Sequence, residues 1–334
     1  MNAGKYLATA LVLTLVLCAP APASIRHVPD QYPAIQSAID DANDGDTVIV
    51  QTGTYTGPGN RDIDFRGKAI TVRSIDPNDP NIVAATVIDC NGTYEDPHRA
   101  FNFHSGESND SILAGLTITG GYAPNEPNTP EIPYTDGIPY YVTGGAIRCS
   151  NASSPVIRQC LITNNTAGWQ SWLTNTGRGG KPVRIHVHGL GAAVYMGPGC
   201  SLVVDSCTFT DNTVFDSDGS GAGLHIESGT LTIIASTFED NSAKDGGAIW
   251  SFDSLIEIKA SQFIANAADQ DGGAIFCEAG SLDMDGCTFI GNAAGKGGAL
   301  ATLDTPLTSQ ECLFRGNSAR AVGGACCSDP QESE

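Results

Sequence analysis

The chain has 334 residues, of which 39 are glycine and only 7% are aromatic, and its formal net charge is −20 at pH 7. So acidic a protein repels a phosphate backbone, which excludes nucleic acid as a partner and favours solubility. Many glycines, few aromatic residues and no long helical periodicity predict one elongated all-β domain.

Residues 1–23 are predicted to form a secretory signal peptide. Lys5 supplies the positive start, residues 7–17 are apolar, and residues 21–23 are small enough for cleavage. A lipid anchor on Cys18 is a weaker alternative. The apolar run is too short to span a membrane, and no later segment is a candidate. We therefore expect a protein that is secreted or held at the cell envelope. Loss of Lys5 would change its net charge from −20 to −21.

The mature chain is predicted to open with its only helix, from Tyr32 to Ala42. Pro33 suits the first helical position, and one face of the helix is apolar. A strand is expected at residues 47–50. Irregular coils follow, with strands expected at residues 69–74, 86–89, 100–103 and 111–119.

Two long segments then interrupt the strands. Residues 122–143 are rich in proline and, after Tyr122, contain Tyr134, Tyr140 and Tyr141. Residues 168–190 contain no acid, and they hold two of the three tryptophans together with several basic side chains. These residues are Trp169, Trp172, Arg178, Lys181, Arg184, His186 and His188.

The remainder of the chain repeats a short phrase. Gly-x-Gly or Gly-Gly-Ala followed by Leu or Ile begins at Gly221, Gly246, Gly272 and Gly297, at intervals of 25, 26 and 25 residues. Each copy ends with Phe-x-x-Asn, and its apolar residues alternate between these phrases. A fixed period of this size predicts stacked coils, each with three short strands that pair with their equivalents about 4.8 Å away.

Stacking would place equivalent residues in columns. Phenylalanine would fill the core, the glycine phrase would turn where a Cβ would clash, and asparagine would adopt a left-handed turn while its amides bond along the stack. The helix would cap the N-terminal end of the core. The fold class is therefore all-β, a right-handed parallel β-helix with an N-terminal capping helix.

The turn before the glycine phrase is lengthened in three consecutive coils. The distance from the asparagine position to the next phrase is 23, 26 and 9 residues there, against 5 or 6 in the last four coils. Since equivalent turns stack, residues 122–143, 168–190 and 213–220 are expected to form one lateral patch. A single domain over 24–334 would thus contain irregular coils to 120, inserted coils at 121–220, regular coils at 221–327 and an acidic tail at 328–334.

Two stretches resemble known families. The opening from Val28 to Ile39, followed by residues 44–50 and 53–55, is similar to the start of secreted proteins of the pectin-lyase-like β-helix superfamily. The Gly-Gly-Ala-Ile and Phe-x-x-Asn pair resembles the repeats of polymorphic outer membrane proteins, which are surface adhesins. The first resemblance implies the fold and admits lyases, hydrolases, esterases and adhesins.

The lengthened turns are the candidate binding site for a polysaccharide or a cell-surface component. Aromatic faces at Trp169, Trp172, Tyr134, Tyr140 and Tyr141 would stack on sugars, and Lys181 and Arg184 would pair with carboxylates. The alternative is a structural role. The aromatic residues would then pack the inserted segments against the solenoid, and the basic side chains of residues 168–190 would neutralise the carboxylates of residues 122–143. The sequence does not indicate an oligomeric state.

The alternative function is a polysaccharide lyase or glycoside hydrolase acting on an acidic polysaccharide. No catalytic signature of this superfamily is present, so the candidates are weak. They are Arg178, Arg184, His186 and His188 for catalysis and Asp216 and Asp218, with Asp205 and Asp211, for Ca²⁺, the one cofactor considered.

Ten of the 11 cysteines remain after removal of the signal peptide. Cys160, Cys207, Cys287 and Cys312 share one predicted column, and coil spacing is compatible with disulfides as well as with buried thiols. Cys326 and Cys327 are weak candidates for pairing with another chain.

Overall fold

The structure is a computed structural model that describes residues 23–124, 140–168, 173–174, 183–184, 187–215 and 219–329. The predicted signal peptide, apart from its last residue, lies outside these ranges. Within them, no helix combines the length and the apolar content needed to cross a membrane.

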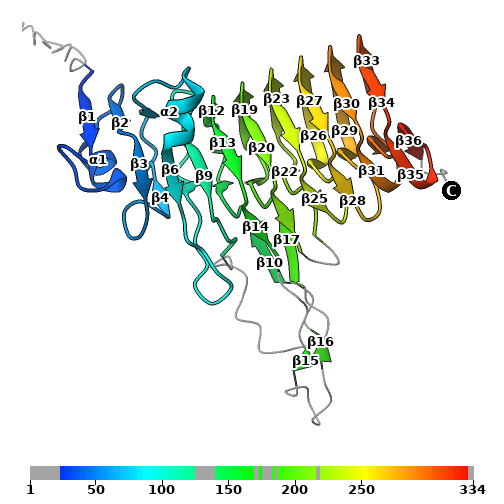
Figure 1. Cartoon of the computed structure of the whole chain (residues 1–334), viewed down its shortest axis with the longest axis horizontal. Helices are drawn as coiled ribbons and strands as arrows, with labels where there is room; N and C mark the ends of the chain where they lie inside the picture. The colour runs from blue at the N-terminus through cyan, green and yellow to red at the C-terminus, as the bar shows by residue number, and fades with distance from the viewer. Residues whose placement is uncertain are drawn as a thin grey trace, which may run out of the picture.

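Parallel strands stack along one long axis and form a right-handed parallel β-helix, which confirms the predicted fold (Figure 1). In the described part of the chain they make three large sheets of 17, 9 and 6 strands. Two strand columns share the first sheet, so the regular coils contribute four short strands rather than the three expected. Residues with positive φ, such as Ser228 at 47° and Asp253 at 48°, lie between these two columns.

The first sheet contains columns 1 and 2, which β26 and β29 both join. Column 1 consists of β4 (Ile63–Asp64), β7 (Phe101–Phe103), β11 (Ile147–Cys149), β18 (Val194–Met196), β22 (Leu224–Glu227), β26 (Ile249–Lys259), β29 (Ile275–Asp285), β32 (Leu300–Leu303) and β36 (Cys326–Asp329). Column 2 consists of β1 (Ile25–Val28), β2 (Thr47–Val50), β5 (Thr71–Ser74), β8 (Ile112–Ala114), β12 (Val156–Arg158), β19 (Ser201–Asp205), β23 (Thr230–Ile234), the second halves of β26 and β29, and β33 (Leu307–Gln310).

The other two large sheets are columns 3 and 4. Column 3 consists of β3 (Gly53–Tyr55), β6 (Thr86–Asp89), β9 (Thr117–Thr119), β13 (Leu161–Thr163), β20 (Thr208–Thr210), β24 (Thr237–Glu239), β27 (Gln262–Ile264), β30 (Thr288–Ile290) and β34 (Leu313–Arg315). Column 4 consists of β14 (Thr166–Ala167), β21 (Thr213–Val214), β25 (Ser242–Ala243), β28 (Ala267–Ala268), β31 (Ala293–Lys296) and β35 (Ser318–Val322).

Aromatic stacking fills the core, as predicted. The rings of Phe238 and Phe263 are 5.0 Å apart and within 6° of parallel, and those of Phe263 and Phe289 are 4.7 Å apart. All three side chains are fully buried. The glycine phrase turns where no side chain fits, because a Cβ on Gly247 would meet the carbonyl oxygen of Gly273 at 2.3 Å.

A ladder of buried asparagines runs beside the phenylalanines. Nδ2 of Asn241 donates to Oδ1 of Asn266 over 3.0 Å, and Nδ2 of Asn266 donates to Oδ1 of Asn292 over 3.0 Å. The prediction of this ladder is confirmed, but the prediction that asparagine itself turns left-handed is wrong. The preceding residue does so, as at Asp240 with φ 53° and Ala265 with φ 53°. Each asparagine is thereby turned inward.

The cysteines within the described residues are free thiols, which resolves the alternative in favour of thiols. Cys207 takes the place of a serine in a second ladder, where the backbone N–H of Cys160 donates to Sγ of Cys207 over 3.5 Å. The equivalent Ser236 accepts from the N–H of Cys207 at 3.1 Å. Burial raises the pKa of Cys277 to about 12 and makes that thiol unreactive at neutral pH.

The N-terminal end is covered by α1 (Ile35–Asp41), whose buried Ile35 and Ile39 join the core. The predicted start at Tyr32, with Pro33 as the first helical residue, is wrong. Ala34 is still extended, and the backbone N–H of Ile35 donates instead to Oδ1 of Asn60 over 3.0 Å.

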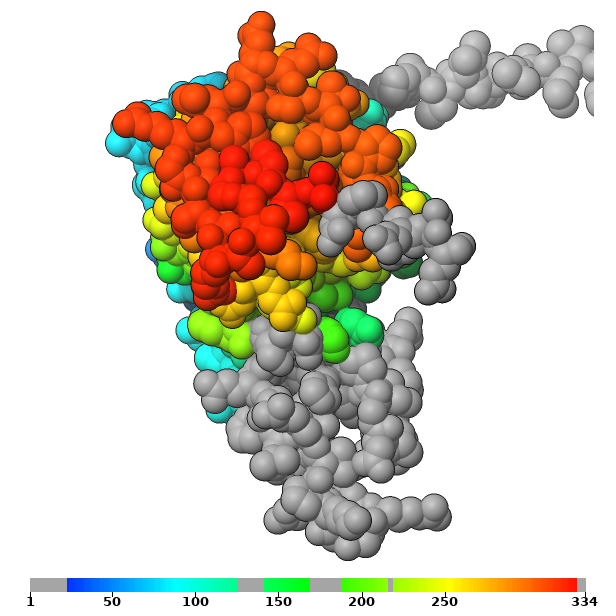
Figure 2. Space-filling view, turned by 90° about the vertical axis from the view of Figure 1, so that its right-hand side faces the viewer, coloured from blue at the N-terminus to red at the C-terminus, as the bar shows by residue number. Residues whose placement is uncertain are grey.

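A second helix, α2 (Pro80–Ala85), was not predicted, because six residues are too few to show a helical period. Asp79 caps it by accepting from the N–H of Asn81 at 2.8 Å. At the opposite end of the solenoid the last coil faces the viewer in Figure 2, and Cys326 and Leu313 are exposed there.

Candidate functional site

The outer face of column 1 carries a row of large side chains. Along each strand, alternate residues point into the core, as Ile249 and Ser251 do, while Trp250 and Phe252 point away from it. Successive register partners on this face form a set that we call the outer column. It consists of Arg148, Tyr195, His225, Trp250 and Phe276.

Three rings of the outer column stack along the solenoid axis. The Tyr195 and His225 rings are 5.5 Å apart, and the His225 and Trp250 rings are 4.3 Å apart and within 9° of parallel. Phe252, two residues further along the same strand, lies beside Trp250 with the ring centroids 6.5 Å apart and is 41% exposed. The imidazole of His225 is thus covered on both faces, and only its edges remain for hydrogen bonding.

Both ring nitrogens of His225 have partners on the same face. Nδ1 is 3.0 Å from Oγ of Ser220, and Nε2 is 3.1 Å from Oε1 of Glu227. The hydroxyl of Tyr195 donates to the other carboxylate oxygen of Glu227 at 3.2 Å. Four side chains from two neighbouring coils therefore form one connected polar network.

Burial and charge fix the protonation of this network. Burial lowers the pKa of His225 and outweighs the opposite effect of Glu227, so the imidazole is neutral at neutral pH. Burial alone would raise the pKa of Glu227, but the hydrogen bonds from His225 and Tyr195 lower it, so Glu227 is ionised. A carboxylate only accepts, so Nε2 carries the proton and Nδ1 accepts from the hydroxyl of Ser220.

A second network lies two coils away on the same face. Nη1 of Arg148 donates to Oγ of Ser150 at 2.8 Å, and its Nε donates to Oγ1 of Thr143 at 3.3 Å. Thr143 and Ser150 occupy the same places relative to Arg148 as Ser220 and Glu227 occupy relative to His225. The outer column therefore presents a cation at one end and aromatic rings further along.

The described ends of the three lengthened turns meet this face. Strand β10 (Tyr140–Thr143) pairs in parallel with β17 (Val187–Leu190), below the middle of the stack in Figure 1. Leu190 forms a bridge with Ser220, where the third turn ends. These ends lie side by side on consecutive coils, as the sequence predicts.

Few of the predicted site residues lie where the structure describes side chains. The rings of Tyr141 and His188 are 5.2 Å apart on β10 and β17. Strands β15 (Leu173–Thr174) and β16 (Val183–Arg184) form an antiparallel pair, but for Arg184 and Tyr140 only the backbone is described. The others lie outside the described residues; these are Tyr134, Trp169, Trp172, Arg178, Lys181, His186, Asp216 and Asp218.

No group of three or more potential metal ligands occurs among the described residues. Of the further Ca²⁺ candidates, Asp205 accepts from the hydroxyl of Ser206 at 2.8 Å and Asp211 from that of Thr210 at 3.1 Å. Both bonds are to the neighbouring residue, as is typical of surface turns.

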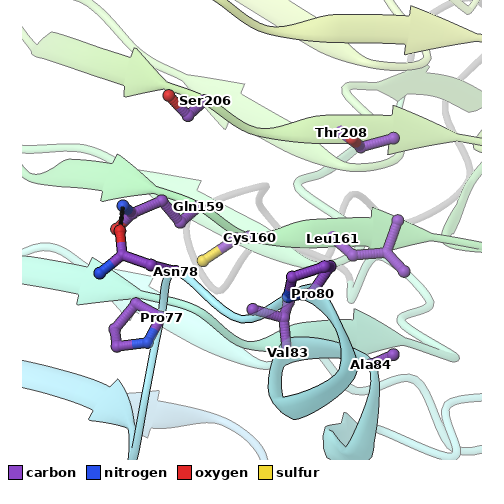
Figure 3. Close-up of a pocket in the computed structure, with 10 residues that line it drawn as sticks. All are labelled: Pro77, Asn78, Pro80, Val83, Ala84, Gln159, Cys160, Leu161, Ser206 and Thr208. Carbon is purple, nitrogen blue, oxygen red and sulfur yellow. Dashed lines mark hydrogen bonds between the residues drawn. The ribbon is translucent and has the colours of Figure 1, made fainter.

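A separate recess lies between α2 and the turns of two later coils, with a cavity volume of about 430 Å³ (Figure 3). Nε2 of Gln159 donates to Oδ1 of Asn78 over 2.5 Å across it, and Val83 and Leu161 provide apolar wall. Its lining carries no charged side chain, so we place the candidate site on the outer column.

The outer column was missed in the sequence, although a signal for it exists. Each of its members follows the first glycine of its own phrase by four residues, from Gly144 and Arg148 to Gly272 and Phe276. His225 and Glu227 are also two positions apart on one strand, and residues at this spacing lie on the same face of a sheet.

The comparison with family models supports the fold. The model of a family described as "right handed beta helix region" matches residues 172–328, just under half of the chain. The chain is similar to the crystal structure of the pectin methylesterase from Aspergillus niger, with 13% sequence identity, a TM-score of 0.31 and coverage of 95% of this chain and 88% of that one. No curated protein matches.

Proposed function

We propose that this is a secreted or cell-surface β-helix protein that binds a polysaccharide along the outer column. The observation that carries the proposal is the row of stacked rings from Tyr195 to Trp250, with Phe252 beside Trp250, next to the ends of the lengthened turns. Tyr195 and His225 are buried in this row, so Trp250 and the 41% exposed Phe252 are the rings that a ligand can reach. Accessible aromatic side chains with a few polar groups nearby are typical of binding surfaces.

The shape of the row favours a linear, repeating ligand. Register partners on adjacent coils recur about every 4.8 Å along the axis, so a polymer lying along the solenoid meets one side chain of the outer column on each coil. A globular partner would not need this repetition. The resemblance of the repeats to surface adhesins, stated above, points the same way.

The charge of the protein favours a ligand with little negative charge. The chain carries a net charge of −20, and Glu227 and Glu278 lie on the outer face of column 1. A polyanion would be repelled by this field. We therefore favour a neutral polysaccharide, or one whose uronic acids are esterified.

The test is binding of the mature protein to immobilised neutral and esterified polysaccharides, compared with Trp250→Ala. We expect binding to weaken roughly tenfold, because loss of one aromatic anchor removes on the order of 1.4 kcal/mol. Leu255→Ala is the matched control, since Leu255 lies on the same strand in column 2 and is 58% exposed.

Two results would contradict this function. Equal binding by Trp250→Ala and the parent protein would remove the outer column from the site. New reducing ends or unsaturated uronate absorbance in the same incubations would instead support the alternative, a polysaccharide lyase or glycoside hydrolase.

A further inference from the structure

We propose that Ser220, His225 and Glu227 form a catalytic relay that hydrolyses carboxylic esters, with Ser220 as nucleophile, His225 as general base and Glu227 as the carboxylate that orients it. The expected substrates are acyl esters on the hydroxyls of a bound polysaccharide. The choice of substrate depends on the proposed function, whereas the relay itself does not.

The geometry has the connectivity that nucleophilic catalysis requires. The hydroxyl of Ser220 is within 3.0 Å of one imidazole nitrogen, and the other nitrogen is within 3.1 Å of a carboxylate oxygen. Because the ionised Glu227 can only accept, the lone pair of Nδ1 faces Ser220. A base in this tautomer can take the proton of the hydroxyl as it attacks.

Packing holds the base in one orientation. Tyr195 and Trp250 cover both faces of the imidazole, and His225 is only 2% exposed. The hydroxyl of Tyr195 in turn holds Glu227 from the far side. Such support for a base and its carboxylate is what positions a catalytic group within a fraction of an ångström.

The fold itself does not require these residues. The next coil has the same backbone, and Ser220, His225 and Glu227 correspond there to Asp245, Trp250 and Phe252. That coil is built without a serine, a histidine or a glutamate at these positions. A purely structural role therefore leaves unexplained why three chemically matched side chains coincide in a single coil.

Ser220 is 7% exposed and lies where the lengthened turns meet the outer column. Ser220 ends the third lengthened turn and bridges to Leu190 at the end of the second. It is followed by Gly221, whose positive φ of 61° makes the sharp turn into β22. The nucleophile thus lies at the border between the outer column and the lengthened turns.

The reaction balances with water as the only co-reactant. Oγ of Ser220 attacks the ester carbonyl carbon, and its proton passes to Nδ1 of His225. The C–O bond to the sugar breaks, the sugar oxygen takes the proton from Nδ1, and an acyl-serine remains. Water then attacks the acyl carbon and gives one proton to Nδ1, which returns it to Oγ as the free acid leaves.

The test uses the full mature protein with a fluorophosphonate probe and with p-nitrophenyl acetate. We expect the probe to modify Ser220, as located by peptide mass spectrometry. Ester hydrolysis should fall at least about 100-fold in Ser220→Ala and in His225→Gln, the size of a lost nucleophile or general base. Ser242→Ala, an exposed serine in column 4, is the control and should retain full activity.

Melting curves show whether each variant is folded. If Ser220→Ala fails to fold, probe labelling of the unmutated protein decides whether Ser220 is the nucleophile. Absence of label on Ser220, or hydrolysis unchanged in a folded Ser220→Ala, would overturn the relay. Labelling with no polysaccharide binding would contradict the proposed function alone. Binding without labelling would contradict the relay alone.

Discussion

His225 shows how burial and a hydrogen-bond partner compete at a single residue. Its side chain is enclosed by two rings and hydrogen-bonded at both nitrogens. Protonation would make the imidazole a cation and would turn Nδ1, which faces Ser220, into a second donor. Burial therefore lowers its pKa despite the carboxylate of Glu227. An exposed histidine beside a glutamate would show the opposite shift.

This shift predicts a pH dependence of stability. The unfolded histidine takes up a proton near its ordinary pKa of 6.5, while the folded one does so only at lower pH. The stabilisation is therefore complete above about pH 7 and is lost as the pH falls through 6.5 towards the folded pKa. Urea unfolding from pH 7.5 to 5 should show a steeper loss of stability in the parent than in His225→Phe; parallel curves would contradict this.

At the scale of an element, the ladders rather than single strands hold the coils together. A strand of two or three residues, such as β28 or β27, has no stability of its own. Oδ1 of Asn266 accepts from Asn241, and its Nδ2 donates both to the carbonyl oxygen of Phe238 and to Asn292. One side chain thus satisfies buried groups on both neighbouring coils and links three coils.

Asn266→Ala should accordingly destabilise the protein by about 3 kcal/mol, since several buried groups lose their partners at once. Gln262→Ala, on the exposed side of the adjacent β27, should change the unfolding free energy by less than about 0.5 kcal/mol. Urea unfolding followed by circular dichroism measures both. Equal effects of the two substitutions would show that the asparagine ladder does not hold the coils together.

At the scale of the whole molecule, the sequence predicts the stack because each coil repeats its core residues in register. Glycines such as Gly247 and phenylalanines such as Phe263 each recur once per coil. Only stacked coils bury both of these sets of residues. Short features escaped prediction for a physical reason: α2 is shorter than two helical turns, and the four-strand coil depends on single left-handed residues.

The sequence predicted that the lengthened turns lie together, but it did not predict the outer column beside them. The lengthened turns do end on one side of the solenoid, but the network of Ser220, His225 and Glu227 depends on side-chain directions across two coils. Ser220 and His225 are five positions apart in the sequence, and they meet because the chain turns sharply at Gly221 between them.

Hydroxyl-radical footprinting read by mass spectrometry tests the central claim, binding along the outer column, most directly. Addition of a bound polysaccharide should reduce oxidation of Trp250 and Phe252, while Ile290, which is 37% exposed on column 3, should react as before. Unchanged oxidation of Trp250 and Phe252 in a saturated complex, or protection on column 3 instead, would contradict the account.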